Sequence, residues 1–440
     1  MTNPTVLMTP RRPALVSGFD NTVDLLVRVQ APATPKATSE RPPLNLAIVL
    51  DRSGSMSGQP LDEAKRCAGM IIDRLGAKDR AALVVYDGDV GVLVPTTQAA
   101  SKATFHTAIA SIHSGGSTNL YGGWLKGAEL MAAVAKDNAT TRILLLSDGQ
   151  ANEGITDLDM IAQQCAELAG VGVTTSTYGL GRHFNEELMI RMANAGHGNS
   201  YYGETAEDLI DPFAEEFDLL AALCAKQIHL HADLSESISF SVLNKFSPNQ
   251  DGSYRLPDLA YEGESWAVIR LRVPKAHTGG GAGALIDLGS IAIRYLDLDG
   301  NPHKLSPLQV SLPSLLPVAF GAIAEDPLVT QRVRELEAAN IQDRAQSAAR
   351  RGDWGEVNRL LGEAKRNAKD NEWLGKVVEK LEELAGQADE AMFSKEAMYA
   401  SRKMRSRLAG VSESASPSEP SPSYLRRKSE QGKGQPRNDA

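Results

Sequence analysis

Two apolar segments, LNLAIVL at 44–50 and RILLL at 142–146, constrain the fold of this chain more than any other feature. A strand with one face in water alternates apolar and polar residues, whereas these segments are apolar nearly throughout. They therefore predict strands that are covered on both faces. A helical stripe that contains Leu61, Ala64 and Ala68 follows the first of them. Strands that alternate with helices predict an α/β fold with a doubly wound, mostly parallel, Rossmann-like sheet.

The same alternation continues to the cysteine at position 224 and defines an expected α/β domain at 44–224. Further strands are expected at 80–87, 90–95, 171–180 and 199–202, and further helices at 120–135, 157–169, 185–195 and 206–223. Residues 1–43 are expected to be a lead-in, loose over residues 1–12, with one strand at 22–29 and a Pro-rich linker.

After Cys224 the apolar residues recur with a period of two, which predicts an antiparallel, β-sandwich-like domain at 225–313. The strand at 22–29 has no partner near it in sequence. We therefore expect residues 14–30 to complete this β domain, so that the α/β domain is an insertion in it.

The chain from 325 to 408 has helical periodicity and predicts a C-terminal helical region of two or three packed helices. Residues 409–440 are rich in Ser and Pro and have few apolar side chains. That composition predicts a disordered tail.

Charge and composition exclude several classes of function. The chain has 46 Lys and Arg against 55 Asp and Glu, a net charge of −9, which disfavours general nucleic-acid binding. It contains no apolar run near the roughly 20 residues that span a membrane. The N-terminus lacks the apolar core of a signal peptide, and the three cysteines do not form a disulfide framework. We therefore expect a cytoplasmic protein.

Oxygen-bearing side chains follow the expected strands at three places. Asp51, Ser53 and Ser55 come directly after the first buried strand, Thr118 lies in the loop GGSTN before a helix, and Asp148 ends the strand RILLLSD. Ligands of open α/β sheets bind at the carboxyl ends of the strands, so these side chains are expected to meet. Two carboxylates and three hydroxyls form an oxygen ligand set that suits Mg²⁺, with Mn²⁺ or Ca²⁺ as alternatives.

These three segments resemble the von Willebrand factor type A domain, bacterial members included, over about residues 44–222. The resemblance implies that Asp51, Ser53, Ser55, Thr118 and Asp148 form the metal-ion-dependent adhesion site of that family. It also implies a function in metal-dependent protein–protein interaction, in which an Asp or Glu of a partner protein completes the coordination. The flanking β segments resemble, in their arrangement, the inter-alpha-trypsin inhibitor heavy chains.

The favoured hypothesis is thus a binding protein and not an enzyme, with no prediction of its oligomeric state. One alternative is an accessory subunit of an AAA+ ATPase complex or of a kinase–phosphatase signalling assembly. Another is a metal-dependent hydrolase, for which His113, close to Thr118, is the available histidine. A metal bound mostly by hydroxyls is a modest activator of water, which makes the hydrolase the weaker alternative.

Overall fold

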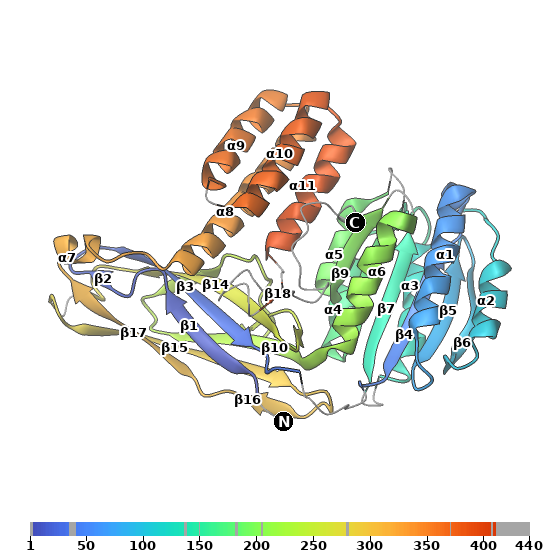
Figure 1. Ribbon diagram of the computed structural model, residues 1–440, viewed down its shortest axis with the longest axis horizontal. Helices are drawn as coiled ribbons and strands as arrows, with labels where there is room; N and C mark the ends of the chain where they lie inside the picture. Colours follow the sequence, from blue (N-terminus) through green and yellow to red (C-terminus); the bar gives the residue numbers. More distant parts are fainter. Residues whose placement is uncertain are drawn as a thin grey trace, which may run out of the picture. The chain divides into compact units, whose positions relative to one another are not determined.

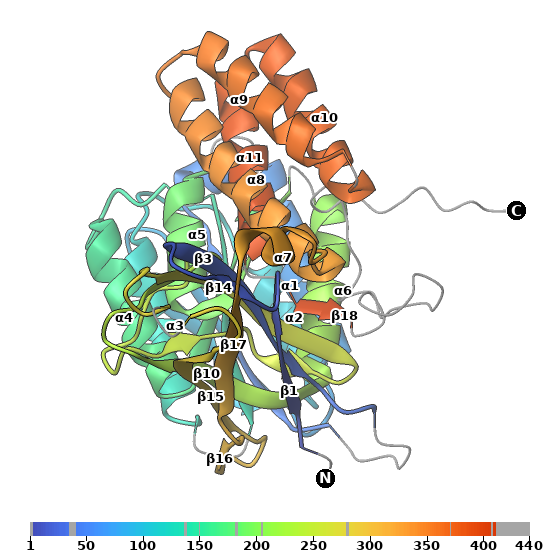
Figure 2. The same cartoon turned by 90° about the vertical axis from the view of Figure 1, so that its left-hand side faces the viewer.

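A computed structural model describes residues 3–34, 41–135, 139–148, 150–180, 184–203, 206–278, 281–369, 371–405 and 408–410. The chain divides into two units (Figures 1 and 2). Within the described residues, one unit is continuous in sequence, 41–221. The other combines residues 3–34 with residues 222–410, so the first unit is inserted into the second.

The inserted unit is built on a sheet with the strand order β6-β5-β4-β7-β8-β9. These strands are β4 (Leu44–Asp51), β5 (Arg80–Tyr86), β6 (Val90–Gln98), β7 (Thr140–Ser147), β8 (Val173–Leu180) and β9 (His197–Gly203). Strand β6 is antiparallel to β5, and the other neighbouring pairs are parallel. Every residue of β4, β7 and β8 is buried, which explains why their sequences show no alternation. The predicted doubly wound α/β fold is confirmed.

Helices cover both faces of this sheet (Figure 1). One group consists of α1 (Gln59–Arg74), α2 (Lys102–Ala110) and α6 (Ala206–Ala221), and the other of α3 (Leu120–Ala132), α4 (Leu158–Gly170) and α5 (Glu186–Ala195). Helix α2 was not expected from the sequence. It is short and buries only Phe105 and Ile109, so its apolar stripe is too brief to show a helical period.

The second unit contains two packed sheets. The first has the order β1-β3-β14-β11, with β18 also paired to β14, and the second has the order β12-β10-β15-β17-β2, with β13 paired to β10 and β16 to β15. The first sheet comprises β1 (Thr5–Pro10), β3 (Asn21–Gln30), β11 (Ser239–Val242), β14 (Gly263–Val273) and β18 (Leu408–Gly410). The second comprises β2 (Leu15–Val16), β10 (Leu223–Leu234), β12 (Tyr254–Arg255), β13 (Leu259–Ala260), β15 (Leu285–Leu296), β16 (Pro302–Lys304) and β17 (Leu308–Leu315).

Strand β3 is the N-terminal contribution to this sandwich. It pairs with β14 along its whole length, from Asn21 opposite Val273 to Gln30 opposite Glu264, and with β1 on its other side. The expectation of a loose lead-in over residues 1–12 was wrong, because residues 5–10 form β1. That segment is short and flanked by prolines, so only its pairing with β3 makes it a strand.

Four long helices follow the sandwich in the described chain, where two or three were expected. They are α8 (Pro327–Ala349), α9 (Trp354–Asn367), α10 (Glu372–Gln387) and α11 (Glu390–Arg405), preceded by the short α7 (Pro317–Gly321). Strand β18 takes in the last residue of the predicted helical region, 408, and residues 409–410 of the tail predicted to be disordered; residues 411–440 lie outside the described residues. None of the helices in the described ranges has both the length and the apolar character needed to cross a membrane.

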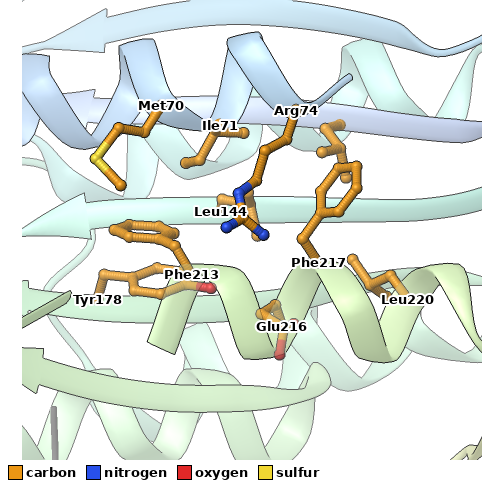
Figure 3. Close-up of a pocket in the computed structure, with 10 residues that line it drawn as sticks. Met70, Ile71, Arg74, Leu144, Tyr178, Phe213, Glu216, Phe217 and Leu220 are labelled. Atoms are coloured by element: carbon orange, nitrogen blue, oxygen red, sulfur yellow. The ribbon is translucent and has the colours of Figure 1, made fainter. Parts of the chain in front are cut away.

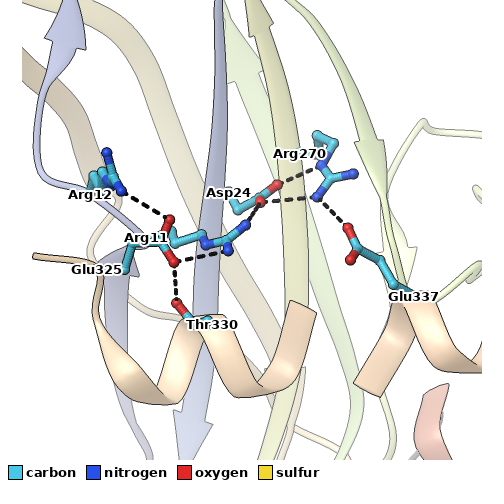
Figure 4. A network of polar contacts seen from close by, with 7 residues as sticks. All are labelled: Arg11, Arg12, Asp24, Arg270, Glu325, Thr330 and Glu337. Carbon is cyan, nitrogen blue, oxygen red and sulfur yellow. Dashed lines mark hydrogen bonds and ion pairs between the residues drawn. The ribbon is translucent and has the colours of Figure 1, made fainter. Parts of the chain in front are cut away.

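Helix α8 packs on the first sheet through an apolar cluster. Its members are Leu26, Trp266 and Val268 from the sheet and Val329, Val333 and Leu336 from the helix. A polar network lies between β1, β3 and β14 and the start of α8 (Figure 4). In it, Asp24 accepts hydrogen bonds from Arg270 at 2.6 and 3.0 Å, and Arg11 contacts Glu325 at 2.9 Å. These ion pairs orient the helix over the sheet.

Candidate metal site

Asp51 is the last residue of β4, and its carboxylate is buried among hydrogen-bond donors. Its Oδ1 accepts a hydrogen bond from the Ser53 amide at 2.9 Å. Its Oδ2 accepts one from the Ser147 hydroxyl at 2.6 Å and one from the Tyr86 hydroxyl at 3.2 Å. Ser53 lies just after β4, Ser147 ends β7, and Tyr86 ends β5. These three strands are neighbours in the sheet. The parallel sheet thus brings their side chains together at its carboxyl edge.

The loop after β4 is tied to the Gly-rich loop that precedes α3. The Arg52 carbonyl accepts a hydrogen bond from the Gly115 amide at 2.7 Å, and the Gly54 amide donates to the Gly116 carbonyl at 2.8 Å. A Cβ atom at Gly115 would collide with the Asp87 carboxylate, so this close approach requires glycine. The two predicted metal-binding loops are therefore held against each other by backbone contacts.

The three hydroxyls have different exposures. The Oγ atoms of Ser53 and Ser55 lie 3.1 Å apart; Ser53 is fully buried and Ser55 is exposed. Thr118 is buried, its amide donates to the Asn152 side chain at 2.8 Å, and its carbonyl accepts from the Asn152 amide at 3.1 Å. Two of the three hydroxyls thus face inward from the carboxyl edge of the sheet, and Ser55 reaches solvent.

Asp148 follows β7 directly and brings a second carboxylate to the same edge. It is 7% exposed, and its Oδ1 accepts a hydrogen bond from the Gln150 amide at 3.2 Å. Burial raises the pKa of Asp51 to about 6, and the negative charge of Asp148 adds to that increase, against the hydrogen bonds from Ser147 and Ser53. The two carboxylates are therefore close enough to repel each other.

The residues present fit a hard divalent cation. Among the described residues, no Lys or Arg pairs with the carboxylate of Asp51 or Asp148. The described chain also contains no group of three or more His, Cys, Asp or Glu side chains placed to hold a metal. A cation at this edge would therefore depend on hydroxyl oxygens in addition to the two carboxylates, a donor set that suits Mg²⁺ better than Zn²⁺.

Several residues around this edge were not identified from the sequence. Tyr86 and Ser147 hold Asp51, and Asn152 holds Thr118, as described above. The Arg52 guanidinium lies 3.2 Å from the Asp87 carboxylate, which places one ion pair beside the site. Their position could have identified two of them, because Tyr86 and Ser147 end the two strands that flank β4. His113 is exposed and, within the described chain, makes no hydrogen bond to any of the five predicted ligands.

A pocket in the same unit lies between α1 and α6 (Figure 3). It is lined by Leu46, Met70, Ile71, Arg74, Leu144, Tyr178, Phe213, Glu216, Phe217 and Leu220. The Glu216 carboxylate is buried and forms an ion pair with Arg142 of β7; it also accepts hydrogen bonds from Ser176 at 2.7 Å, Asn199 at 2.6 Å and Tyr201 at 3.0 Å. One side chain of α6 is thus bound to β7, β8 and β9.

The geometry of this unit agrees with the comparison against known families. The family model of the von Willebrand factor type A domain matches residues 45–215 of the chain. Residues 45–215 are a von Willebrand factor type A domain. The predicted resemblance is confirmed, and the five predicted ligands lie at the carboxyl edge of this domain. Such domains are typically modules of protein–protein interaction or adhesion, and they often bind a metal ion.

Proteins that contain this domain are similar to the chain over different lengths. An uncharacterized protein of Synechocystis is 26% identical over 72% of this chain and 78% of its own length. The uncharacterized protein YfbK of Escherichia coli is 32% identical over 46% of this chain, but over only 36% of its own length. Inter-alpha-trypsin inhibitor heavy chain H3 of Mus musculus is 28% identical over 36% of this chain and 18% of its own length.

Two solved structures share the fold along most of the chain. A von Willebrand factor type A protein from Catenulispora acidiphila has a TM-score of 0.67 at 18% identity and covers 91% of this chain and 96% of its own. The ArnB paralog VWA2 from Sulfolobus acidocaldarius has a TM-score of 0.63 at 17% identity and covers 92% and 99%. At these identities the likeness establishes the fold alone.

Proposed function

We propose that the protein binds a partner protein through a divalent cation held at the carboxyl edge of the sheet. Ser53, Ser55 and Thr118 would supply hydroxyl oxygens, and Asp51 and Asp148 would supply carboxylates. The bound cation would supply an electrophilic centre for an Asp or Glu carboxylate of the partner. The proposed cation is Mg²⁺, with Mn²⁺ or Ca²⁺ as alternatives.

The observation that supports this proposal is a pair of buried carboxylates that have hydrogen-bond donors but, among the described residues, no cationic partner. Asp51 is fully buried and Asp148 nearly so, and no cationic side chain of the described residues pairs with either carboxylate. Buried carboxylates are costly unless a cation or hydrogen bonds offset their charge. The elevated pKa of Asp51, about 6, follows from burial first and from Asp148 in part, and the positive charge of a divalent cation would oppose both effects.

We propose binding in preference to catalysis. A metal-dependent hydrolase needs a general base beside the metal, and the histidine considered for that role, His113, is exposed and makes no hydrogen bond to the five predicted ligands in the described chain. The partner, its pathway and the choice between adhesion and service as a subunit of a larger assembly are left to experiment. The cytoplasmic location stays a prediction.

Affinity purification of the full chain tests the proposal. Wild-type protein, Asp51→Ala and Asp89→Ala are compared in Mg²⁺ and in EDTA, and bound proteins are identified by mass spectrometry. Asp89 is a matched control, because it is an exposed acid in the turn between β5 and β6 and is not one of the predicted ligands. A partner that is lost in Asp51→Ala and in EDTA, but retained by Asp89→Ala, supports metal-bridged binding. Partners that survive both treatments contradict it.

A further inference from the structure

We propose that Tyr86 and Ser147 are positioning residues of the cation site, which act by fixing the carboxylate of Asp51. This inference rests on the proposed function, because it concerns the same cation. It adds two residues that do not belong to the ligand set and assigns them a measurable effect on metal affinity.

Both residues donate to one oxygen of the carboxylate. The Ser147 hydroxyl lies 2.6 Å and the Tyr86 hydroxyl 3.2 Å from Asp51 Oδ2, while Oδ1 accepts the Ser53 amide at 2.9 Å. A carboxylate that accepts three hydrogen bonds from three directions has one orientation. The carboxylate therefore enters metal binding with its rotation already restricted.

The Tyr86 side chain is itself held in place by packing. It ends β5, is fully buried, and its ring lies against α3 at Gly123, where any Cβ atom would overlap the ring. This packing holds the side chain with its hydroxyl directed at Asp51. A phenol is protonated at neutral pH and therefore acts as a donor to the carboxylate.

Hydrogen-bond donors to a metal ligand change the metal affinity of a site by a known range. Groups that hydrogen-bond a metal ligand fix its orientation, and their removal commonly costs about 10- to 100-fold in metal affinity. We therefore expect Tyr86→Phe, which removes one oxygen and keeps the ring, to weaken Mn²⁺ binding by that factor. Ser147→Ala is expected to weaken it in the same direction.

Tyr178 offers a matched control. It lies on β8 of the same sheet and is fully buried, and its hydroxyl has no hydrogen-bond partner in the described chain. Its ring stacks on Phe213 with the centroids 3.9 Å apart, in the pocket between α1 and α6. Tyr178→Phe is thus the same chemical change at a buried position in the same sheet, without the contact to Asp51.

The test measures Mn²⁺ affinity of the full chain by electron paramagnetic resonance of the bound ion, together with the Tm of the metal-free protein. The expected result for Tyr86→Phe and Ser147→Ala is a higher Kd for Mn²⁺ and an altered spectrum of the bound ion. The affinity and the spectrum of Tyr178→Phe are expected to equal those of the wild type. Because Ser147→Ala reports on the same oxygen, the inference remains falsifiable if Tyr86→Phe does not fold.

The outcomes separate this inference from the proposed function. If wild-type protein binds Mn²⁺, Asp51→Ala abolishes binding, and both Tyr86→Phe and Ser147→Ala bind as tightly as Tyr178→Phe, the positioning role is refuted and the cation site stands. If wild-type protein does not bind Mn²⁺, or Asp51→Ala binds it unchanged, the cation site and the positioning role are both refuted.

Discussion

The guanidinium of Arg332 lies 4.6 Å from the ring centroid of Trp266, with both side chains almost completely buried. Arg332 belongs to α8 and Trp266 to β14. The same guanidinium contacts Glu264 at 3.7 Å and Glu335 at 3.3 Å, both of them buried carboxylates. A charge on the helix is therefore compensated by groups of the sheet and of the helix, which commits α8 to this position on the sandwich.

Arg332→Met is expected to destabilise the second unit by about 3–5 kcal/mol, because it removes a buried guanidinium that contacts the buried carboxylates of Glu264 and Glu335. Hydrogen exchange of α8 and β14, together with denaturant unfolding, measures the effect. Arg344→Met is the control: it changes an exposed arginine of the same helix and should have little effect on either measurement. Equal stabilities of the two variants would show that the Arg332 contacts do not stabilise the helix on the sheet.

Glu216→Gln is expected to destabilise the von Willebrand factor type A domain by a similar amount, about 3–5 kcal/mol, because the Arg142 guanidinium loses its buried counter-charge. Burial alone would raise the pKa of Glu216, but the charge of Arg142 and the hydrogen bonds from Ser176 and Asn199 bring it below the ordinary value of 4.5.

The lowered pKa of Glu216 also sets the direction of a pH effect. A carboxyl group whose pKa is lower in the folded state contributes stability above its unfolded pKa and loses it as the pH falls through the folded value. Wild-type Tm should therefore decrease below about pH 4.5, and Glu216→Gln should lack that part of the decrease. The exposed Glu167→Gln should follow the wild-type curve.

Asp51 predicts the opposite pH effect. Its pKa, about 6 in the metal-free fold, lies above the usual 3.8, so the folded state binds the proton more tightly than the unfolded state. Stability of the metal-free protein should therefore fall as the pH rises from about 4 to 6. Asp51→Asn should stabilise the metal-free protein at pH 7.5 by up to about 3 kcal/mol, with little gain at pH 4.

Mg²⁺ provides the complementary measurement on Asp51. Mg²⁺ should raise the Tm of the wild type at pH 7.5 and lose this effect as the pH falls below about 6, since the proton and the cation compete for Asp51. Asp51→Asn should not respond to Mg²⁺. Thermal scans in Mg²⁺ and in EDTA at the two pH values are sufficient, and a wild type that is insensitive to Mg²⁺ would contradict the prediction.

The insertion of one unit into the other predicts how fragments behave. A fragment of residues 40–221 should fold alone, because all strands of its sheet lie within it. A fragment from 222 to 410 should not, because β1, β2 and β3 are all missing and β14 loses its neighbour β3. Adding a peptide of residues 3–34 should restore its near-ultraviolet circular dichroism, and the same peptide with Val27→Asp should not, since Val27 is buried in the sandwich core.

Local periodicity predicted the α/β sheet well, and it predicted the candidate site because that site is a property of strand ends. Asp51 ends β4 and Asp148 follows β7; because these strands pair in parallel, residues almost a hundred positions apart in sequence come to the same edge of the sheet. The roles of Tyr86 and Ser147 were not visible, because a tyrosine at the end of a buried strand has the same pattern whether or not its hydroxyl meets a carboxylate.

Helix α8 shows where periodicity fails. It contacts β3 and β14 as well as α9 and α11, so it is covered on more than one side. Arg332, Glu335 and Gln342 are buried in it alongside the apolar side chains. A helix that buries charged and apolar residues together shows no single apolar stripe along its whole length, so its sequence resembles that of a solvated helix.

The sequence by itself determined the alternation of strands and helices in the inserted unit and the change to a hydrophobic period of two after Cys224. It also singled out five oxygen-bearing side chains, which stay the predicted ligands of the candidate site. These depend on neighbouring residues and on the rule that parallel strands end at one edge. Only the tertiary structure decided that β1 is a strand, that β3 lies between β1 and β14, and which donors hold Asp51 and Glu216. Each of these depends on partners far away in sequence, whose contacts exist only after the chain has folded.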